Sequence, residues 1–355
     1  GLFVPNNYYA TSSYYVGSSL IGTQDLVMRG NTMEDVQNLA MWFYLNARVK
    51  DAQFIDNEVI GAPPRYGVYN QDSSSISFVA HNNEIHADNP VYSRSAQQYT
   101  ITDNTITGIS DPSRPCIYAL NGHGVIRGNS CMDADGGIRI TGVRSGNDVW
   151  IEGNTIGFST GRVPTSAIGI YVESCGLDEV FMANNHVSTI MNAVNTDGCT
   201  VTDNGSVYQA LPGIAARTWN VDSDATTFSP AHLTNVCIGD SVRWTARAYN
   251  SGTPHTTTSD AGQTESWDSG TMNLGSSFVH TFTTAGNFTY ASSGTPSVTG
   301  SVNVAACTSN LVTTGFDVLG GADDLVLNGV SILGYGTGLE MSGGSLAMNA
   351  GVSAL

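Results

Sequence analysis

Positive charge is scarce in this chain. Its 355 residues include 13 Lys and Arg against 30 Asp and Glu, the formal net charge at pH 7 is −17, and Lys50 is the sole lysine. A polyanionic partner such as nucleic acid is disfavoured, because phosphates are bound through clustered Lys and Arg side chains. A simpler interpretation of the same charge is that it keeps the protein in solution.

Long apolar runs and paired-cysteine motifs are also missing. No stretch of about 18 apolar residues occurs, which argues against a transmembrane helix and membrane insertion. No CxxC pair occurs, so a zinc or thiol redox site has no support. The chain starts at Gly1 without Met and shows no signal peptide, as expected of a processed or truncated product. We expect no metal and no other cofactor.

A short phrase built around asparagine recurs along the chain. In Ile101-Thr-Asp-Asn104-Thr-Ile, apolar and polar residues alternate, and an asparagine stands where an ordinary strand seldom places one. The asparagines in equivalent phrases are Asn31, Asn57, Asn83, Asn104, Asn129, Asn154, Asn185, Asn204, Asn328 and Asn349. From Asn31 to Asn204 the steps are 26, 26, 21, 25, 25, 31 and 19 residues. A period of this size indicates a solenoid.

Stacking gives each repeat a way to bury its apolar face, because each strand then pairs in parallel with its equivalent in the next coil. An asparagine at the bend can bond to the asparagine of the next coil, and it tolerates the left-handed conformation of a tight bend. Turn asparagines of an antiparallel sandwich are the alternative, which ten recurrences in one frame disfavour. The repeat resembles the right-handed parallel β-helix family, which includes pectate lyases and carbohydrate-binding repeat proteins, over about 250 residues.

The phrase disappears between about Trp219 and Cys307. Alternating strand patterns with Gly-Asp and Ala-Gly turns replace it, and they indicate an antiparallel sandwich. The Pro-His255-Thr phrase and the segment from Tyr290 to Gly300 resemble the cupredoxin family of small, plastocyanin-like copper proteins. We therefore predict an all-β chain. A right-handed parallel β-helix occupies 1–216 and 308–355, and a cupredoxin-like antiparallel β-sandwich at 217–307 interrupts it.

The cupredoxin resemblance implies four copper-ligand positions. His255 matches the first histidine, whereas Ser292, Thr295 and Val298 stand where the family has cysteine, histidine and methionine. A hydroxyl cannot replace the thiolate of a blue-copper site. The resemblance therefore implies a copper-free binding or packing module, with His255 as a leftover, partly exposed histidine.

Six cysteines permit 15 pairings. Spacing favours Cys175 with Cys199, one coil apart, and Cys237 with Cys307, which bracket the sandwich. Cys116 and Cys131 remain. We expect three disulfides and an extracellular address. A ladder of buried free cysteines in a cytosolic solenoid is the alternative.

Catalysis on a polysaccharide would need two suitably separated carboxyl groups. Asp133 and Asp135 alternate in Cys131-Met-Asp-Ala-Asp-Gly and would both face outward, and Glu152 lies one coil further on. Asp148, Arg139 and His123 could lie nearby. A solvated Asp- and Gly-rich turn explains the same residues, so we assign no catalytic residue.

These observations favour an extracellular, non-enzymatic structural or surface protein. It would assemble with copies of itself into a filament, sheath or surface layer, because an open coil can stack on the next subunit. Two alternatives remain. One is a polysaccharide-active enzyme (a lyase, hydrolase or epimerase), and the other is a glycan-binding adhesin that uses aromatic side chains on one solenoid face.

Overall fold

In this computed structural model, the described residues are 8–9, 15–16, 25–36, 39–43, 51–61, 64, 66–71, 76–94, 96–108, 115–132, 136–143, 148–157, 162–163, 168–176, 178–189, 192–210, 218–223, 227–246, 255–273, 275–293, 295–306, 314–319, 324–349 and 351–354. Within these ranges every regular element is a β-strand. The chain is therefore all-β, as predicted.

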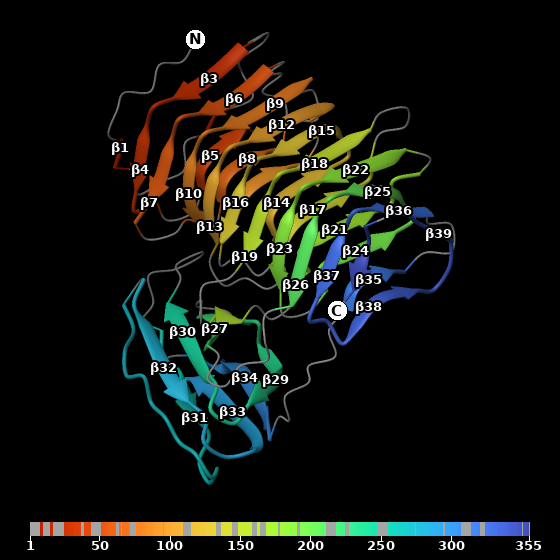
Figure 1. The fold of residues 1–355 in the computed structure, drawn as a ribbon. Helices are drawn as coiled ribbons and strands as arrows, with labels where there is room; N and C mark the ends of the chain where they lie inside the picture. Colours follow the sequence, from red (N-terminus) through yellow and green to blue (C-terminus); the bar gives the residue numbers. More distant parts are fainter. Residues whose placement is uncertain are drawn as a thin grey trace.

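Three parallel sheets wind around one core, and each coil gives one strand to each sheet (Figure 1). Sheet C contains β3 (Asp25–Arg29), β6 (Asp51–Ile55), β9 (Ser77–His81), β12 (Gln98–Thr102), β15 (His123–Arg127), β18 (Val149–Glu152), β22 (Glu179–Ala183), β25 (Thr200–Asn204), β36 (Asp324–Asn328) and β39 (Ser345–Met348). The chain then bends into sheet A, which contains β1 (Tyr8–Tyr9), β4 (Thr32–Glu34), β7 (Glu58–Ile60), β10 (Glu84–Ala87), β13 (Thr105–Gly108), β16 (Ser130–Met132), β19 (Thr155–Gly157), β23 (His186–Thr189), β26 (Val207–Ala210), β37 (Ser331–Leu333) and β40 (Ser353–Ala354). Sheet B follows with β2 (Tyr15–Val16), β5 (Leu39–Phe43), β8 (Tyr66–Asn70), β11 (Asn89–Ser93), β14 (Pro115–Leu120), β17 (Gly136–Thr141), β21 (Ile170–Glu173), β24 (Val194–Asp197), β35 (Thr314–Val318) and β38 (Thr337–Met341).

The solenoid core is built by strict register. Ile101 pairs with Ile126, and Ile126 with Ile151, so like residues stack in the interior and are fully buried. Because successive side chains of a strand point to opposite faces, the residues between them form the outer surface. In-register stacking therefore arranges both the core and the surface in columns that follow the solenoid axis.

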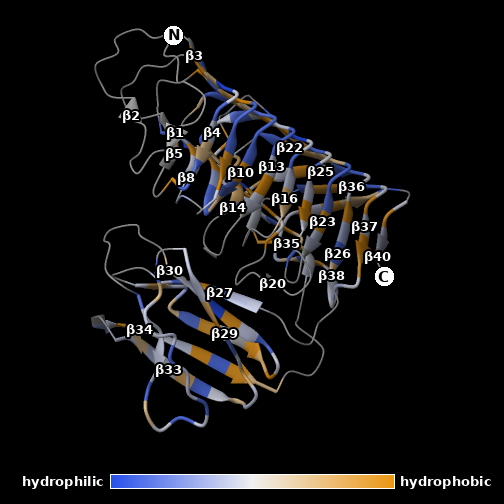
Figure 2. Cartoon of the chain, turned by 90° about the vertical axis from the view of Figure 1, so that its left-hand side faces the viewer, coloured by the Kyte–Doolittle hydropathy of each residue, from blue (hydrophilic) through white to orange (hydrophobic). Residues whose placement is uncertain are grey.

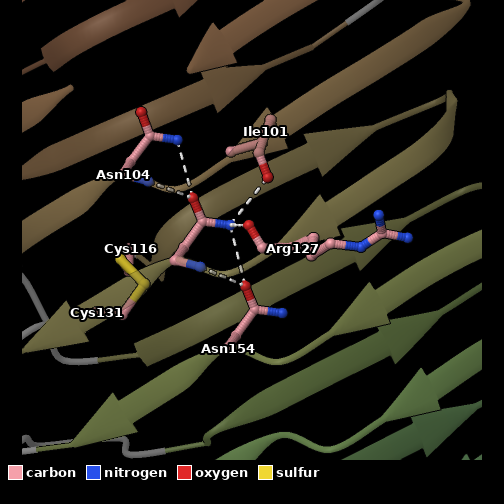
Figure 3. The surroundings of a disulfide bond; sticks show 7 residues. Ile101, Asn104, Cys116, Arg127, Cys131 and Asn154 are labelled. Carbon is pink, nitrogen blue, oxygen red and sulfur yellow. Dashed lines mark hydrogen bonds between the residues drawn. A yellow bond between two sulfur atoms is a disulfide. The ribbon is translucent and has the colours of Figure 1, made fainter. Parts of the chain in front are cut away.

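A ladder of buried asparagines runs along the bend between sheets C and A (Figure 3). The Asn104 backbone N–H and Nδ2 both donate to Asn129 Oδ1, at 3.1 and 2.8 Å. Asn129 repeats both bonds to Asn154, and its Nδ2 also donates to the carbonyl of Ile101. The same pattern connects Asn31, Asn57, Asn83, Asn104, Asn129, Asn154 and Asn185. The bend asparagines therefore satisfy buried backbone groups from coil to coil.

The prediction that Asn204 continues this ladder is wrong. Asn185 donates its backbone N–H to Ser206 Oγ instead, at 3.0 Å, while Asn204 pairs with Ala183 and is exposed. The bend requires a residue with positive φ before the ladder position, and here Gly205 provides it, two residues later than the phrase suggested. Asn204, Asn328 and Asn349 form a separate, exposed row of amide hydrogen bonds.

Disulfides join Cys116 to Cys131 and Cys175 to Cys199, which confirms both predicted pairs, and all four cysteines are buried. Cys116 lies in β14 of sheet B and Cys131 in β16 of sheet A, so this bond crosses the core. Cys237 is also disulfide-bonded, and its predicted partner Cys307 lies outside the described residues.

A second pair of sheets follows β26 in the sequence, before the solenoid resumes at β35 (Figure 1). The first contains β20 (Arg162–Val163), β27 (Thr218–Ser223), β30 (Ser241–Ala246) and β32 (Ser277–Thr281), with β28 (Phe228–Ser229) paired to β27. The second contains β29 (His232–Cys237), β34 (Thr295–Ala305), β33 (Gly286–Ser292) and β31 (Thr258–Ser259).

Hydrophobic and hydrophilic residues alternate along several strands of these sheets (Figure 2). The two sheets enclose their own core, which includes Trp244, Trp267 and Tyr290. Their pairing is mixed, whereas the sequence indicated an antiparallel sandwich: β27 pairs with β30 and β29 with β34 in parallel. The strand pairing of the solenoid continues across the insertion. β25, before the insertion, pairs directly with β36, after it, and Asn204 lies opposite Asn328. One strand crosses between the two parts: β20, from a loop of the solenoid, pairs with β27.

Candidate functional site

The outer face of sheet C carries a mostly apolar column of side chains that we call the sheet C column. Its members lie in register on neighbouring coils: Val27, Gln53, Val79, Thr100, Val125, Trp150, Phe181, Thr202, Val326 and Ala347. Val27 is 41 % exposed and Trp150 40 % exposed. The Trp150 and Phe181 rings stack with centroids 4.4 Å apart. Seven of the ten members are apolar, and Gln53, Thr100 and Thr202 lie between them, so the longest apolar run is Val125, Trp150 and Phe181.

Charged side chains at the end of these strands pair with each other across coils. Arg127 Nε donates to Glu152 Oε2 at 2.8 Å, and Arg29 lies 3.8 Å from Asp56. Glu152, a candidate catalytic carboxylate, is therefore held by a cation of the preceding coil. The other two candidates, Asp133 and Asp135, lie outside the described residues.

The remaining residues considered with Glu152 do not surround it. His123 begins β15 and Asp148 precedes β18, both at the opposite end of the sheet C strands from Glu152. Arg139 lies in β17 of sheet B, where it pairs with Glu173. The structure therefore does not bring Arg139, His123 and Asp148 together around Glu152.

The outer face of sheet B carries a column of tyrosines that continues into carboxylates, which we call the sheet B column. Its members in register are Tyr69, Tyr92, Tyr118, Arg139, Tyr171, Asn195, Asp317 and Glu340. Tyr92 lies with its ring centroid 4.7 Å from that of Tyr69 and 4.8 Å from that of Tyr118, edge to face. Burial raises the pKa of Tyr92 to about 12, and the neighbouring tyrosines add to this effect. The hydroxyl of Tyr92 is therefore protonated at neutral pH.

Arg139 lies at the centre of the sheet B column. Its guanidinium carbon is 5.3 Å from the Tyr118 ring centroid and 5.1 Å from that of Tyr171, which is cation–π distance on both sides. Its Nη2 donates to Glu173 Oε1 at 2.6 Å, and Thr141 donates to the same oxygen. Burial would raise the pKa of Glu173, but hydrogen bonds from Thr141, Arg139 and Tyr171 outweigh it and lower that pKa. The ion pair is thus locally neutral.

Two carboxylates end the sheet B column. Asp317 and Glu340 lie directly opposite each other on adjacent coils. Burial and the charge of Glu340 raise the pKa of Asp317, although Asn192 donates a hydrogen bond to it at 3.1 Å. Among the described residues no cationic side chain pairs with either carboxylate. Within the described part of the chain, this end of the column therefore carries two neighbouring carboxylates without a cationic partner.

Sequence reasoning missed the sheet B column, although a signal was present. A β-branched residue precedes a large side chain in Val68-Tyr69, Val91-Tyr92, Ile117-Tyr118, Ile138-Arg139 and Ile170-Tyr171. The loops before sheet B vary in length, so these pairs fall at different distances from the asparagine phrase. Their common register is set by strand pairing and is not visible as a fixed spacing.

One of the positions that the cupredoxin resemblance assigned to copper, Ser292, lies in a cluster of hydroxyl groups next to His255. Thr256, next to His255, bonds to the hydroxyl of Ser293 at 2.9 Å and lies 3.4 Å from that of Ser292. His255 is 4 % exposed, so the expectation of a partly exposed histidine is wrong, and Ser292 is 5 % exposed. Val298 is buried among the core residues. Thr295 begins β34. This donor set, with hydroxyls and no thiolate, does not fit a blue-copper ion.

Neither a metal cluster nor a membrane helix was found in the described part of the chain. No three His, Cys, Asp or Glu side chains gather there as metal ligands. No described helix is long and apolar enough to span a membrane.

Residues 49–211 match the family described as "Right handed beta helix region". Together with the three parallel sheets, this match shows that the solenoid part of the chain has a parallel β-helix fold. No curated protein matches it.

Among solved structures, a reduced amicyanin mutant is 26 % identical over 26 % of this chain and 86 % of its own length, with a TM-score of 0.23. A purple cupredoxin from Nitrosopumilus maritimus is 24 % identical over 24 % of this chain and 98 % of its own, with a TM-score of 0.20.

Proposed function

We propose that this chain is an extracellular, non-enzymatic surface protein whose solenoids associate side by side through the sheet C column. The observation that carries this proposal is the exposed apolar column itself, with Val27 and Trp150 among its most exposed members. Exposed apolar surface such as that of Trp150 and its neighbours Val125 and Phe181 is typical of an interaction site, because its burial releases ordered water, which stabilises association by about 25 cal/mol per Å².

The partner is a second copy of the chain. The column repeats once per coil along ten paired strands, so a partner that covers it needs the same linear repeat. A second solenoid presents that repeat, and two identical faces can meet around a twofold axis. Repetition of such contacts builds a filament, sheath or surface layer.

Other features support an exported scaffold. The buried disulfides are typical of oxidising compartments. Arg127 and Glu152, like Arg139 and Glu173, are used to join neighbouring coils, which favours a structural use of these charges over a catalytic one. We further propose that 217–307 is a cupredoxin-like insert that works as a packing or binding module without copper, oriented by the pairing of β20 with β27.

The test is lateral association of the purified chain. Multi-angle light scattering and electron microscopy of the wild type should show side-by-side pairs or larger arrays that grow with concentration. The double variant Val125→Lys/Trp150→Lys should remain monomeric. The matched control Thr105→Lys/Thr155→Lys adds the same charge to exposed positions of sheet A and should still associate. A wild type that stays monomeric at high concentration, or a control that dissociates equally, would refute the proposal.

A further inference from the structure

A pair of opposite charges borders the longest apolar run of sheet C, which consists of Val125, Trp150 and Phe181. Arg127 lies two residues after Val125, and its Nε donates to Glu152 Oε2 at 2.8 Å. Glu152 lies two residues after Trp150. Because alternate side chains of a strand share one face, both charges lie beside the run on the outer face. Any surface that covers the run therefore also meets this ion pair.

The ion pair lies at the middle of sheet C, since β15 and β18 are the fifth and sixth of its ten strands. A second copy that faces this sheet with its own sheet C covers all ten strands only when the two midpoints coincide. A shift along the solenoid leaves strands uncovered at one end of each copy. The contact with the largest overlap is therefore centred between Val125 and Trp150.

The insert leaves sheet C free. It follows β26 of sheet A and precedes β35 of sheet B, so it departs from the corner between these two sheets. Figures 1 and 2 show it on the other side of the solenoid from the strands of sheet C. When two copies meet through sheet C, each insert therefore points away from the contact.

Two kinds of twofold axis bring identical sheet C faces together. The first axis is parallel to the strands and passes midway between β15 and β18. It reverses the order of the coils, so that β15 of one copy faces β18 of the other. Arg127 then lies opposite Glu152 of the second copy, and the four charges of the two ion pairs alternate in sign. His123, which begins β15, faces Asp148, which precedes β18, in the same way.

The second axis is parallel to the solenoid. It keeps the order of the coils and reverses the strands, so that the end of each strand faces the start of the same strand in the second copy. Glu152 at the end of β18 then meets Asp148, and two carboxylates come together near the centre of the contact. Arg127 meets His123 in place of a carboxylate. The second arrangement therefore replaces attraction by repulsion at the ion pair.

The first arrangement has one like-charge contact of its own. It brings Asp51 opposite Asp324, one strand from either end of the sheet. These carboxylates already accept hydrogen bonds from Ser77 and Ser345 of their own chain. Solvent and salt screen charges at the edge of a contact more strongly than at its centre. The central charges therefore decide between the two arrangements.

We propose that two copies of the chain pair in antiparallel orientation through sheet C, around the twofold axis between β15 and β18. This inference rests on the proposed side-by-side association and assigns its geometry. Val125 of each copy packs against Trp150 of the other, and beside them Arg127 and Glu152 pair both within and between copies. Complementary charge selects this orientation, because the other one leaves like charges in contact.

The distance between spin labels distinguishes the two orientations. Val27→Cys and Ala347→Cys place a nitroxide on β3 and β39, at opposite ends of the sheet C column, where both residues are exposed. Nine steps of about 4.8 Å separate these strands, so equivalent labels of an antiparallel pair should lie about 45 Å apart in either sample. A mixture of the two variants should add a short distance, with backbones about 10 Å apart, because Val27 faces Ala347 of the second copy. Dipolar electron paramagnetic resonance measures both distances.

Charge reversal tests the centre of the contact. Arg127→Glu alone puts four carboxylates around the axis and Glu152→Arg alone puts four guanidinium groups there, so each variant should pair about tenfold more weakly than the wild type. A mixture of the two should regain the affinity, since every glutamate then faces an arginine of the other variant. Sedimentation velocity measures the pairing. The control variants Thr105→Glu and Thr155→Arg add charges of the same signs to exposed positions of sheet A and should pair like the wild type.

The outcomes separate this geometry from the association itself. Short distances within each single-labelled sample, with the long distance in the mixture, would overturn the antiparallel geometry while side-by-side association stands. A mixture of Arg127→Glu with Glu152→Arg that pairs no better than either variant alone would also overturn it. A wild type that stays monomeric would overturn both the association and its geometry.

Discussion

Asn185 and Ser206 meet where the buried asparagine ladder ends. The Asn185 backbone N–H donates to Ser206 Oγ at 3.0 Å, and Ser206 in turn donates to Asp203 Oδ1 at 2.6 Å. Tyr208 donates to the other oxygen of Asp203 at 2.7 Å. Asp203 is fully buried at a core position that Met182 occupies in the preceding coil and Leu327 in the next. The hydrogen-bond chain of seven asparagines thus ends on a carboxyl group in the last coil before the insertion.

This arrangement predicts an unusual dependence of stability on pH. Burial raises the pKa of Asp203, so the folded chain holds its proton to a higher pH than the unfolded chain does. The contribution of Asp203 to the unfolding free energy is fully present below the pKa of an aspartate in the unfolded chain, about 4. It is lost as the pH rises through the pKa of Asp203 in the folded chain. Asp203→Asn should remove this loss. The unfolding free energy of the variant, relative to that of the wild type, should therefore increase as the pH rises. Urea unfolding of both proteins between pH 4 and 8 measures it, and parallel profiles would show that Asp203 does not titrate in this way.

The asparagine ladder should be costly to break. Asn104 donates three hydrogen bonds and its Oδ1 accepts two more from Asn83, all buried. Asn104→Ala leaves several buried groups unsatisfied and should cost about 2–3 kcal/mol of unfolding free energy. Asn328→Ala is the matched control, because its amide bonds are exposed, and it should cost under about 0.5 kcal/mol. Denaturant titration of the two variants measures both losses of unfolding free energy. Similar losses would show that burial of the ladder does not add to stability.

The two described disulfides should resist reduction in the folded protein. Cys116 and Cys131 are 0 % and 1 % exposed, so a thiol reagent reaches them only when the chain opens. Mass spectrometry after alkylation should find both bonds intact with reductant alone and open with reductant plus denaturant. Cys116→Ala/Cys131→Ala should lower the unfolding free energy by about 3 kcal/mol, since the bond closes a 15-residue loop. Rapid reduction under native conditions would contradict the buried placement.

The inserted sandwich should not take up copper. Ser292, Thr295 and Val298 supply two hydroxyls and an aliphatic side chain where thiolate, imidazole and thioether are needed. Titration with Cu(II) should give no blue thiolate-to-copper absorption band. The triple variant Ser292→Cys/Thr295→His/Val298→Met should gain it, because His255 is already in place. A blue band in the wild type would refute the copper-free assignment, and an absent band in a folded triple variant would refute the alignment of these positions.

Much of the solenoid was readable in advance. The asparagine phrase predicted the coils, and the one-coil spacing of Cys175 and Cys199 predicted their disulfide, whereas Cys116–Cys131 followed as the pair that remained. The phrase and the Cys175–Cys199 spacing repeat at about the length of a coil, so they are visible in the sequence itself. The error at Asn204 comes from the same phrase. The phrase was matched by residue type, whereas the position of the bend is set by the positive φ of Gly205.

By itself, the sequence determined the periodic pattern, and with it the parallel coils and the buried ladder, because burial of the apolar faces requires that like residues stack. It also determined which copper-ligand types are missing. Only the tertiary structure decided which residues lie next to each other on the outer faces of the sheets. Loops of different length separate Tyr118, Arg139 and Tyr171, and the insert separates Asn195 from Asp317. Strand pairing absorbs these differences, since the backbone register fixes each residue on its sheet whatever the loop before it contains.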